Sequence, residues 1–120
     1  MPFDWREYLN LAKNLGGLGS TGYSQEAADR SAVSRAYYAA FCWARNYAEQ
    51  LLDFERSGTA KDHKCLRKCL QQRGKTEIAS GLNQLRGWRN VCDYDDQVPE
   101  LRQQVVHAIK IAAKLIQRCR

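Results

Sequence analysis

Apolar residues recur along much of this chain at spacings of three and four, the pattern of helices that bury one face. The longest such stretch starts after Ser24, which can cap a helix N-terminus, and contains no glycine or proline before Gly58. We expect one helix of about 30 residues here, on the order of 45 Å long. Its apolar seam is formed by Val33, Tyr37, Ala40, Ala44, Tyr47 and Leu51.

Shorter amphipathic stretches precede and follow this long segment. They begin near residues 4, 62, 76 and 99, and glycine, proline or capping residues separate them. Asp62 is placed to cap the third helix, and Pro99 stands near the first turn of the fifth. Short loops between consecutive helices favour antiparallel neighbours. The sequence therefore predicts one all-α domain over residues 1–120, a four- to five-helix up-and-down bundle with one long central helix.

Composition agrees with a globular domain of this kind. Hydrophobic residues make up 44% and charged residues 27% of the chain, which are ordinary fractions for soluble proteins. No apolar stretch approaches the roughly 20 residues of a membrane-spanning helix, and the first residues lack the pattern of a signal peptide. We expect a cytoplasmic protein with no membrane association.

The five cysteines do not suggest a disulfide framework, because their number is odd and a reducing compartment keeps them as thiols. Cys65 and Cys69 lie near His63, but the usual two-residue gap between zinc-binding cysteines and a second pair of ligands are both missing. We expect no metal and no other cofactor.

Positive charge is concentrated in the second half of the chain. The net charge is +6, and residues 61–120 hold thirteen Lys and Arg against six Asp and Glu, a balance of +7. Such an excess favours a polyanionic partner, either a nucleic acid or an acidic protein. A solvated basic surface is the alternative.

Two polar segments stand beside the apolar pattern. On the long helix, Arg35 and Tyr38 share a polar stripe next to the apolar seam. Near the end of the fourth helix, Arg86, Arg89 and Asp93 are spaced by three, four and seven positions and so share one face. In a purely structural interpretation, Arg89 pairs with Asp93 across one turn, and the acidic residues from Asp93 onward cap the next helix.

The sequence Ser-Arg-Ala-Tyr-Tyr-Ala-Ala-Phe at 34–41 lies in the long helix, His63 begins the next helix, and Arg-Asn-Val-Cys-Asp-Tyr-Asp at 89–95 precedes the last one. Together these segments resemble the HEPN superfamily. The likeness is to small stand-alone bacterial and archaeal members. It implies a helical bundle that forms a homodimer, with its functional cleft at the two-fold axis. Many members are metal-independent ribonucleases of toxin-antitoxin or defence systems, often beside a nucleotidyltransferase antitoxin.

The nuclease motif of this family is an arginine followed, after four to six residues, by a histidine. Arg89 and Asn90 match its start, whereas Tyr94 stands at the first position where the histidine is expected. Cleavage of RNA without a metal needs a base for the ribose hydroxyl and cations for the charged transition state. The resemblance implies catalytic roles for Arg89, Asn90, Asp93 and Tyr94, and RNA contacts for Arg35, Tyr38 and Arg86.

Two functions follow from the resemblance and the missing histidine. In the first, the protein is an RNA-directed ribonuclease with a degenerate motif. In the second, it is a non-catalytic dimeric module that binds RNA, a nucleotide or a partner protein such as a nucleotidyltransferase. His63 has the intrinsic pKa of a base, and the competing interpretation is a helix-start histidine bonded to the backbone. A third interpretation gives the tyrosines and arginines only a packing role at the dimer interface.

Overall fold

The computed structural model of the chain describes residues 4–15 and 22–119. All regular elements in these ranges are α-helices, which confirms the predicted all-α fold. Within the same ranges, no helix has both the length and the apolar content needed to cross a lipid bilayer. The helices are α1 (Arg6–Leu15), α2 (Gln25–Leu51), α3 (Lys61–Gln72), α4 (Thr76–Tyr94) and α5 (Leu101–Arg118).

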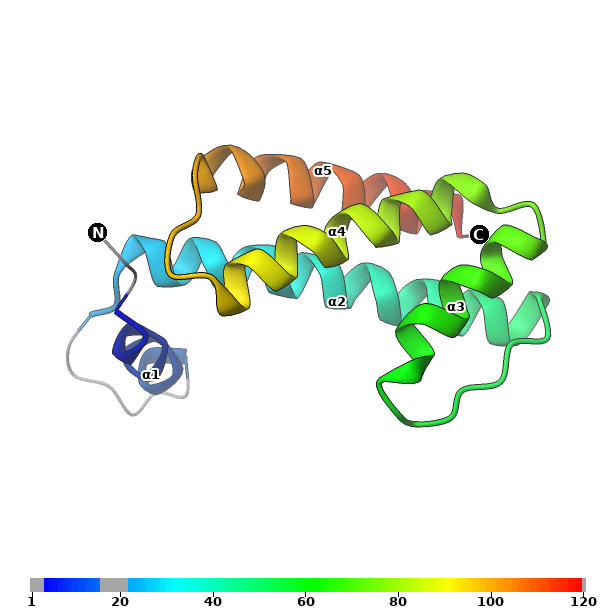
Figure 1. Cartoon of the computed structure of the whole chain (residues 1–120), viewed down its shortest axis with the longest axis horizontal. Helices are drawn as coiled ribbons and strands as arrows, with labels where there is room; N and C mark the ends of the chain where they lie inside the picture. The colour runs from blue at the N-terminus through cyan, green and yellow to red at the C-terminus, as the bar shows by residue number, and fades with distance from the viewer. Residues whose placement is uncertain (1–3, 16–21, 120) are drawn as a thin grey trace.

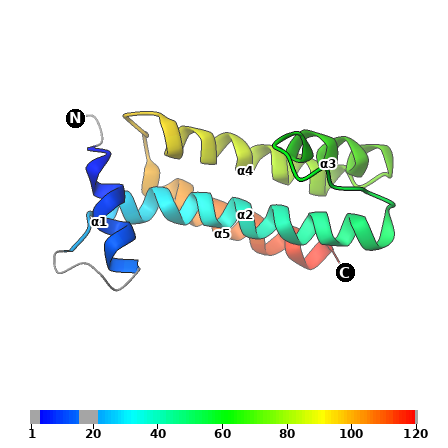
Figure 2. The ribbon, with the colours of Figure 1, turned by 90° about the horizontal axis from the view of Figure 1, so that it is seen from below.

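Three long helices, α2, α4 and α5, lie side by side along the molecule (Figure 1). The chain runs one way in α2, returns in α4 and reverses again in α5. The short helix α3 packs against α4 and α2 at the end of the molecule where α4 begins, and α1 lies across α2 near the opposite end (Figure 2). The predicted up-and-down bundle with a long central helix is confirmed.

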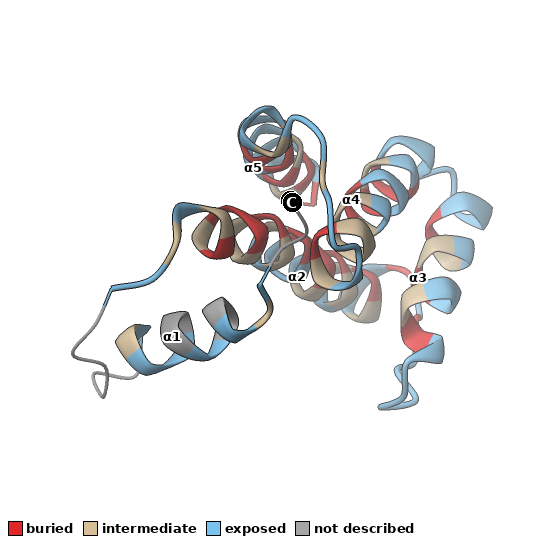
Figure 3. Cartoon of the chain, turned by 60° about the vertical axis from the view of Figure 1, so that its left-hand side comes forward, coloured by how far each residue is buried: buried red, intermediate tan, exposed pale blue. Residues whose placement is uncertain are grey.

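The core lies between the facing sides of α2, α4 and α5, as the burial colours show (Figure 3). On α2 the small residues Ala40, Ala44 and Ala48 are fully buried. Small side chains at a helix contact let the neighbouring helices approach closely. Larger buried side chains fill the space between the helices, among them Leu66, Leu70, Ile78, Leu82, Leu85, Val105 and Leu115.

The long helix α2 ends at Leu51, although the sequence has no glycine or proline before Gly58 and predicts a longer helix. Beyond it, Asp53 has a φ of 58°, in the left-handed region, and the chain turns back. The turn buries Leu52 and Phe54, while Leu51, predicted to continue the seam, is 59% exposed. The predicted boundary is wrong because the burial of these two side chains decides it, and no glycine or proline marks the turn.

Two predicted helix caps are also wrong. Asp62 lies inside the first turn of α3, where its carboxylate accepts hydrogen bonds from the backbone N–H groups of Ser57 and Gly58 at 2.8 and 3.0 Å. The Ser57 hydroxyl donates a third bond at 2.7 Å. These bonds, first of all that from the Ser57 backbone, lower the pKa of the Asp62 carboxyl group and fix the loop before α3. At α5 the N-cap residue is Glu100, so residues 93–96 do not cap that helix.

Candidate functional site

Aromatic residues on α2 hold a histidine from α3. Tyr37 is buried in the core, and its hydroxyl group forms a hydrogen bond with Nδ1 of His63. The imidazole stacks on Phe41, with 4.1 Å between the ring centroids and 11° between the planes. Its centroid lies 6.2 Å from that of Tyr38 in a T-shaped arrangement. The His63 side chain is therefore fixed by side chains of α2, and the interpretation in which it bonds to the backbone is wrong.

Arg89 on α4 contacts the same two tyrosines. Its Nη1 atom donates a hydrogen bond of 2.7 Å to the Tyr38 hydroxyl oxygen, and Nη2 donates one of 2.7 Å to the side-chain oxygen of Asn90. The guanidinium carbon lies 5.4 and 5.3 Å from the ring centroids of Tyr37 and Tyr38, which are cation–π distances. The predicted ion pair with Asp93 is confirmed, with 3.6 Å between Nη1 and Oδ2.

The guanidinium group of Arg89 is only partly satisfied by these contacts. Its Nε atom is buried and has no hydrogen-bond partner among the described residues. The side chain as a whole is 17% exposed. Buried donors in proteins are nearly always paired, so this nitrogen is an exception beside the two bonded Nη atoms of the same side chain.

Two further arginines, Arg67 on α3 and Arg86 on α4, act on the same groups. Nη1 of Arg67 donates a hydrogen bond of 3.1 Å to the backbone oxygen of His63. The charges of Arg67, Arg86 and Arg89 all influence the ionisation of both His63 and Tyr37. In the described part of the chain, neither Arg67 nor Arg86 forms an ion pair with a carboxylate.

Burial and this positive charge set the ionisation of the site. Burial is the largest cause that lowers the pKa of His63, and the charges of Arg89, Arg67 and Arg86 lower it further. Because the ordinary pKa of a histidine is already about 6.5, the imidazole is neutral at pH 7. Burial has the opposite effect on the Asp93 carboxyl group and raises its pKa, against the charge of Arg89.

A groove with a volume of about 410 Å³ lies beside this cluster. Its walls include Arg35, Tyr38 and Asp93, so three of the residues predicted to act on RNA share one surface. The first helix contributes Ala12 and Leu15 to the same groove. The Tyr38 ring is 42% exposed and borders both the groove and the histidine cluster.

Tyr94, predicted to be catalytic, is the last residue of α4 and is 72% exposed. It takes no part in the hydrogen bonds of Arg89. The sequence did not identify two groups of the site, Arg67 and the hydroxyl of Tyr37. Tyr37 belongs to the apolar seam of α2, and that position indicates only packing. Arg67 follows His63 by four positions, so its place on the same face of α3 could have been found.

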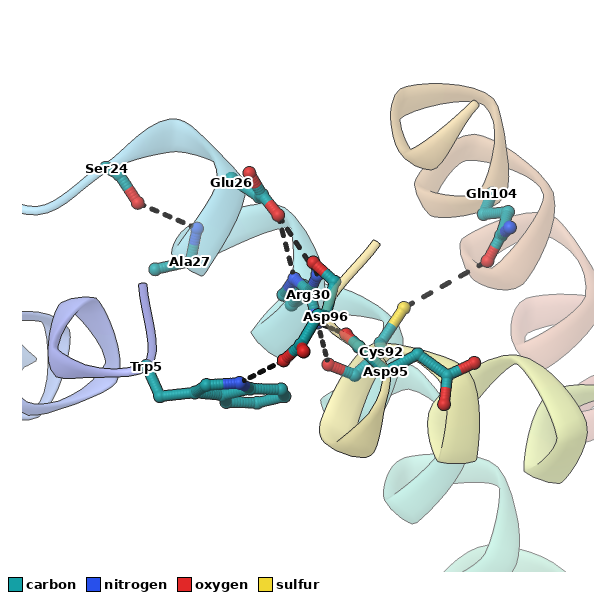
Figure 4. Close-up of polar contacts among 9 residues, drawn as sticks. All are labelled: Trp5, Ser24, Glu26, Ala27, Arg30, Cys92, Asp95, Asp96 and Gln104. Atoms are coloured by element: carbon teal, nitrogen blue, oxygen red, sulfur yellow. Dashed lines mark hydrogen bonds and ion pairs between the residues drawn. The ribbon is translucent and has the colours of Figure 1, made fainter. Parts of the chain in front are cut away.

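A buried arginine fixes the C-terminal end of α4, close to the site (Figure 4). Arg30 of α2 is fully buried. Its Nη1 atom donates hydrogen bonds to the carbonyl oxygens of Cys92 and Asp95 at 2.8 and 2.7 Å, and Nη2 donates to that of Asp96 at 3.1 Å. Trp5 lies with its ring centroid 5.1 Å from the guanidinium carbon and donates a hydrogen bond to the Asp96 carboxylate. Carbonyls at a helix C-terminus lack partners within the helix, so Arg30 caps α4 from a neighbouring helix.

The position of Arg30 carries a signal that sequence reasoning left unused. It precedes Val33 by three positions and Tyr37 by seven, and therefore belongs to the buried face of α2. An arginine on a buried face requires acceptors from another element. The sequence could therefore have predicted a cap or an ion pair at this position, although not the carbonyls that provide it.

The fold and the site together define a helical-bundle protein with an arginine-rich cluster around a neutral histidine. Among the described residues, no group of three His, Cys, Asp or Glu side chains is placed to hold a metal ion. No family model, no curated protein and no solved structure matches this chain. Membership of the HEPN superfamily stays a prediction that rests on the motifs at 34–41 and 89–95.

Proposed function

We propose that this chain is an RNA-directed protein of the HEPN type, that it acts in a cytoplasmic toxin-antitoxin or defence system, and that it binds the RNA backbone at the cluster between α2, α3 and α4. The observation that carries this proposal is the unbalanced positive charge of the cluster. Arg67, Arg86 and Arg89 all act on His63, and in the described ranges only Asp93 forms an ion pair with any of these arginines.

A bound anion would neutralise part of the excess positive charge of Arg67, Arg86 and Arg89. The pKa of Arg67 is lowered, first by burial and then by the charge of Arg86, which shows that the two guanidinium groups repel each other. Phosphate suits such a place because the planar guanidinium fork donates paired hydrogen bonds to phosphate oxygens.

The neighbouring groove favours a nucleic acid over free phosphate. Tyr38 presents a partly exposed ring whose hydroxyl is held by Arg89. Nucleobases stack on such rings, at about 1–3 kcal/mol per base. Arg35 lines the same groove and supplies a further cation for the backbone. A strand that crosses the cluster can place a phosphate on the arginines and a base against Tyr38.

The resemblance adds three elements to the proposal. The protomers pair as a homodimer, which brings two copies of the cluster near the two-fold axis. A nucleotidyltransferase antitoxin serves as the protein partner. Tyr94, with 72% of its surface exposed, acts as a contact to RNA or to the second subunit and not in proton transfer.

A binding titration at several salt concentrations tests the RNA-binding function. The protein is titrated into fluorescently labelled single-stranded RNA, and anisotropy gives the affinity at each salt concentration. The slope of log affinity against log salt changes by about 0.7 for each phosphate contact to a single strand. We expect the double variant Arg67→Gln/Arg86→Gln to flatten the slope by about 1.4, because two such contacts are lost.

The matched control is Lys110→Gln/Lys114→Gln, which removes two exposed positive charges from α5, a helix that contributes none of the site residues. This control should leave the slope nearly unchanged. Equal losses in both double variants would show that only the overall charge matters. Absent or salt-independent binding would contradict the proposal and leave a protein partner as the function of the cluster.

A further inference from the structure

We propose that His63 is the general base of an RNA cleavage reaction at this cluster, and that it supplies from α3 the imidazole that does not follow Arg89 on α4. This inference rests on the proposed RNA-binding function and goes beyond it, because the same cluster could bind RNA without cutting it. The sequence motif contains no histidine at the expected spacing. The fold brings one to the same tyrosine pair from a different helix.

The two halves of the site meet at Tyr37 and Tyr38. Arg89 bonds to the hydroxyl of Tyr38 and lies over both tyrosine rings, and His63 bonds to the hydroxyl of Tyr37 and contacts both rings. A cation for the phosphate and an imidazole for the ribose hydroxyl therefore stand on one aromatic platform. Phe41 completes it by stacking on the imidazole.

The hydrogen bonding of His63 suits a base. One ring nitrogen, Nδ1, is bonded to the Tyr37 hydroxyl, which fixes the orientation of the ring. In the tautomer with its proton on Nδ1, that N–H donates to the tyrosine oxygen, and the lone pair of Nε2 can accept a proton. His63 as a whole residue is half-buried. Tyr37 is a positioning residue in this arrangement.

The reaction balances without a metal or another co-reactant. Nε2 of His63 takes the proton from a ribose 2′-hydroxyl, whose oxygen attacks the adjacent phosphorus. The new O2′–P bond forms as the P–O5′ bond breaks, and the leaving 5′ oxygen takes a proton from solvent water. The products are a 2′,3′-cyclic phosphate and a 5′-hydroxyl end. Arg89 and Arg67 stabilise the negative charge that develops on the phosphate oxygens.

The surroundings of His63 keep it in the basic form at neutral pH. Burial and the nearby arginines lower its pKa, and Tyr37 has a raised pKa because burial disfavours the phenolate. The rate should rise as the pH increases through the pKa of His63 and level off before pH 7. The ionisable groups that contact or act on His63 are Tyr37 and Tyr38 of α2, Asp62 and Arg67 of α3, and Arg86 and Arg89 of α4.

The test compares His63→Asn with His107→Gln, which changes the other histidine of the chain, an exposed residue of α5. Asparagine keeps a polar group near the position of Nδ1 for Tyr37 but has no counterpart of Nε2. Single-stranded RNA labelled at its 5′ end is incubated with each protein in the presence of a chelator. The rate, the end groups of the products and the RNA affinity are measured between pH 5 and 8.

We expect the wild type and His107→Gln to release cyclic phosphate ends at the same rate. His63→Asn should be slower by about 100-fold or more, the lower range for loss of a general base, with RNA affinity unchanged within about twofold. RNA with 2′-O-methyl groups should bind and stay intact. If His63→Asn unfolds, His63→Gln provides the same comparison, and Tyr37→Phe should shift the pH at which the rate is half maximal.

The results separate this inference from the proposed function. Salt-dependent RNA binding without cleavage by the wild type overturns the role of His63 and leaves the binding function standing. Cleavage by His63→Asn at the wild-type rate, or cleavage of 2′-O-methyl RNA, also overturns it. If Arg67→Gln/Arg86→Gln and Lys110→Gln/Lys114→Gln change the salt slope of RNA binding equally, the binding function itself is contradicted.

Discussion

Replacement of Arg30 by methionine should destabilise the protein more than any exposed arginine substitution. Methionine keeps the apolar length of the side chain but removes every donor. Arg30 provides hydrogen bonds to three carbonyl oxygens of the α4 terminus and one to Glu26. The variant therefore leaves the end of α4 without its cap.

The size of the effect follows from which acceptors can regain water. Cys92 is fully buried, so water cannot replace the charge-assisted bond that its carbonyl loses, whereas Asp95 and Asp96 are exposed and their carbonyls can be hydrated again. The Glu26 side chain is 43% exposed and contributes little. Methionine leaves no unpaired buried charge, so the cost is that of a buried polar group that loses its partner, about 1–3 kcal/mol. That is a sizeable part of the roughly 5–15 kcal/mol by which a domain is stable.

Urea unfolding followed by circular dichroism measures this loss as a shift of the midpoint at constant slope. The control is Arg35→Met, an exposed position on the same helix, which should stay within about 0.5 kcal/mol of the wild type. Arg30→Lys should fall between the two, because a single ammonium group cannot repeat the fork of three bonds. An Arg30→Met variant within about 1 kcal/mol of Arg35→Met would refute the capping role.

Two glycine substitutions should stabilise the protein, and one aspartate substitution should destabilise it. Gly87→Ala should raise the free energy of unfolding by about 0.5–1 kcal/mol, since the added methyl group meets nothing within 4 Å. Gly81→Ala should raise it less, because its methyl group would approach Leu115 at 3.1 Å. Chemical denaturation of both variants provides the comparison, and an equal gain would contradict it. Asp62→Asn should lower the melting temperature at pH 7, because the carboxylate accepts bonds from Ser57 and its pKa is lowered by them. A group with a lowered pKa stabilises above its unfolded value and loses this effect in acid, so the difference from the wild type should shrink as the pH falls below about 4.

Local rules recovered most of the fold. The spacing of apolar residues predicted each helix and most of the buried face of α2, because a 3.6-residue period is visible within a single segment. The same rules failed at the end of α2, where the chain turns at Asp53 without glycine or proline. That turn depends on the burial of Leu52 and Phe54 against other helices, which no local pattern contains.

In the candidate site, too, contacts within one helix could be predicted from the sequence and contacts between helices could not. The Arg89–Asp93 pair spans one turn of a helix and could be predicted from the sequence. The bond between Tyr37 and His63 joins residues 26 positions apart and depends on how α3 crosses α2. Sequence reasoning could identify His63 as a titratable group, but only the packing of two helices determines what it faces.

Helix geometry explains why a histidine from α3 is better placed here than one at position 94. Five residues along an α-helix turn a side chain by about 140°. Accordingly Arg89 is 17% exposed, whereas Tyr94, five residues later on the same helix, is 72% exposed. A histidine in place of Tyr94 would therefore face solvent. His63 approaches the tyrosine pair from a second helix and avoids this constraint, so α3 can bring an imidazole to the two tyrosines that Arg89 also contacts.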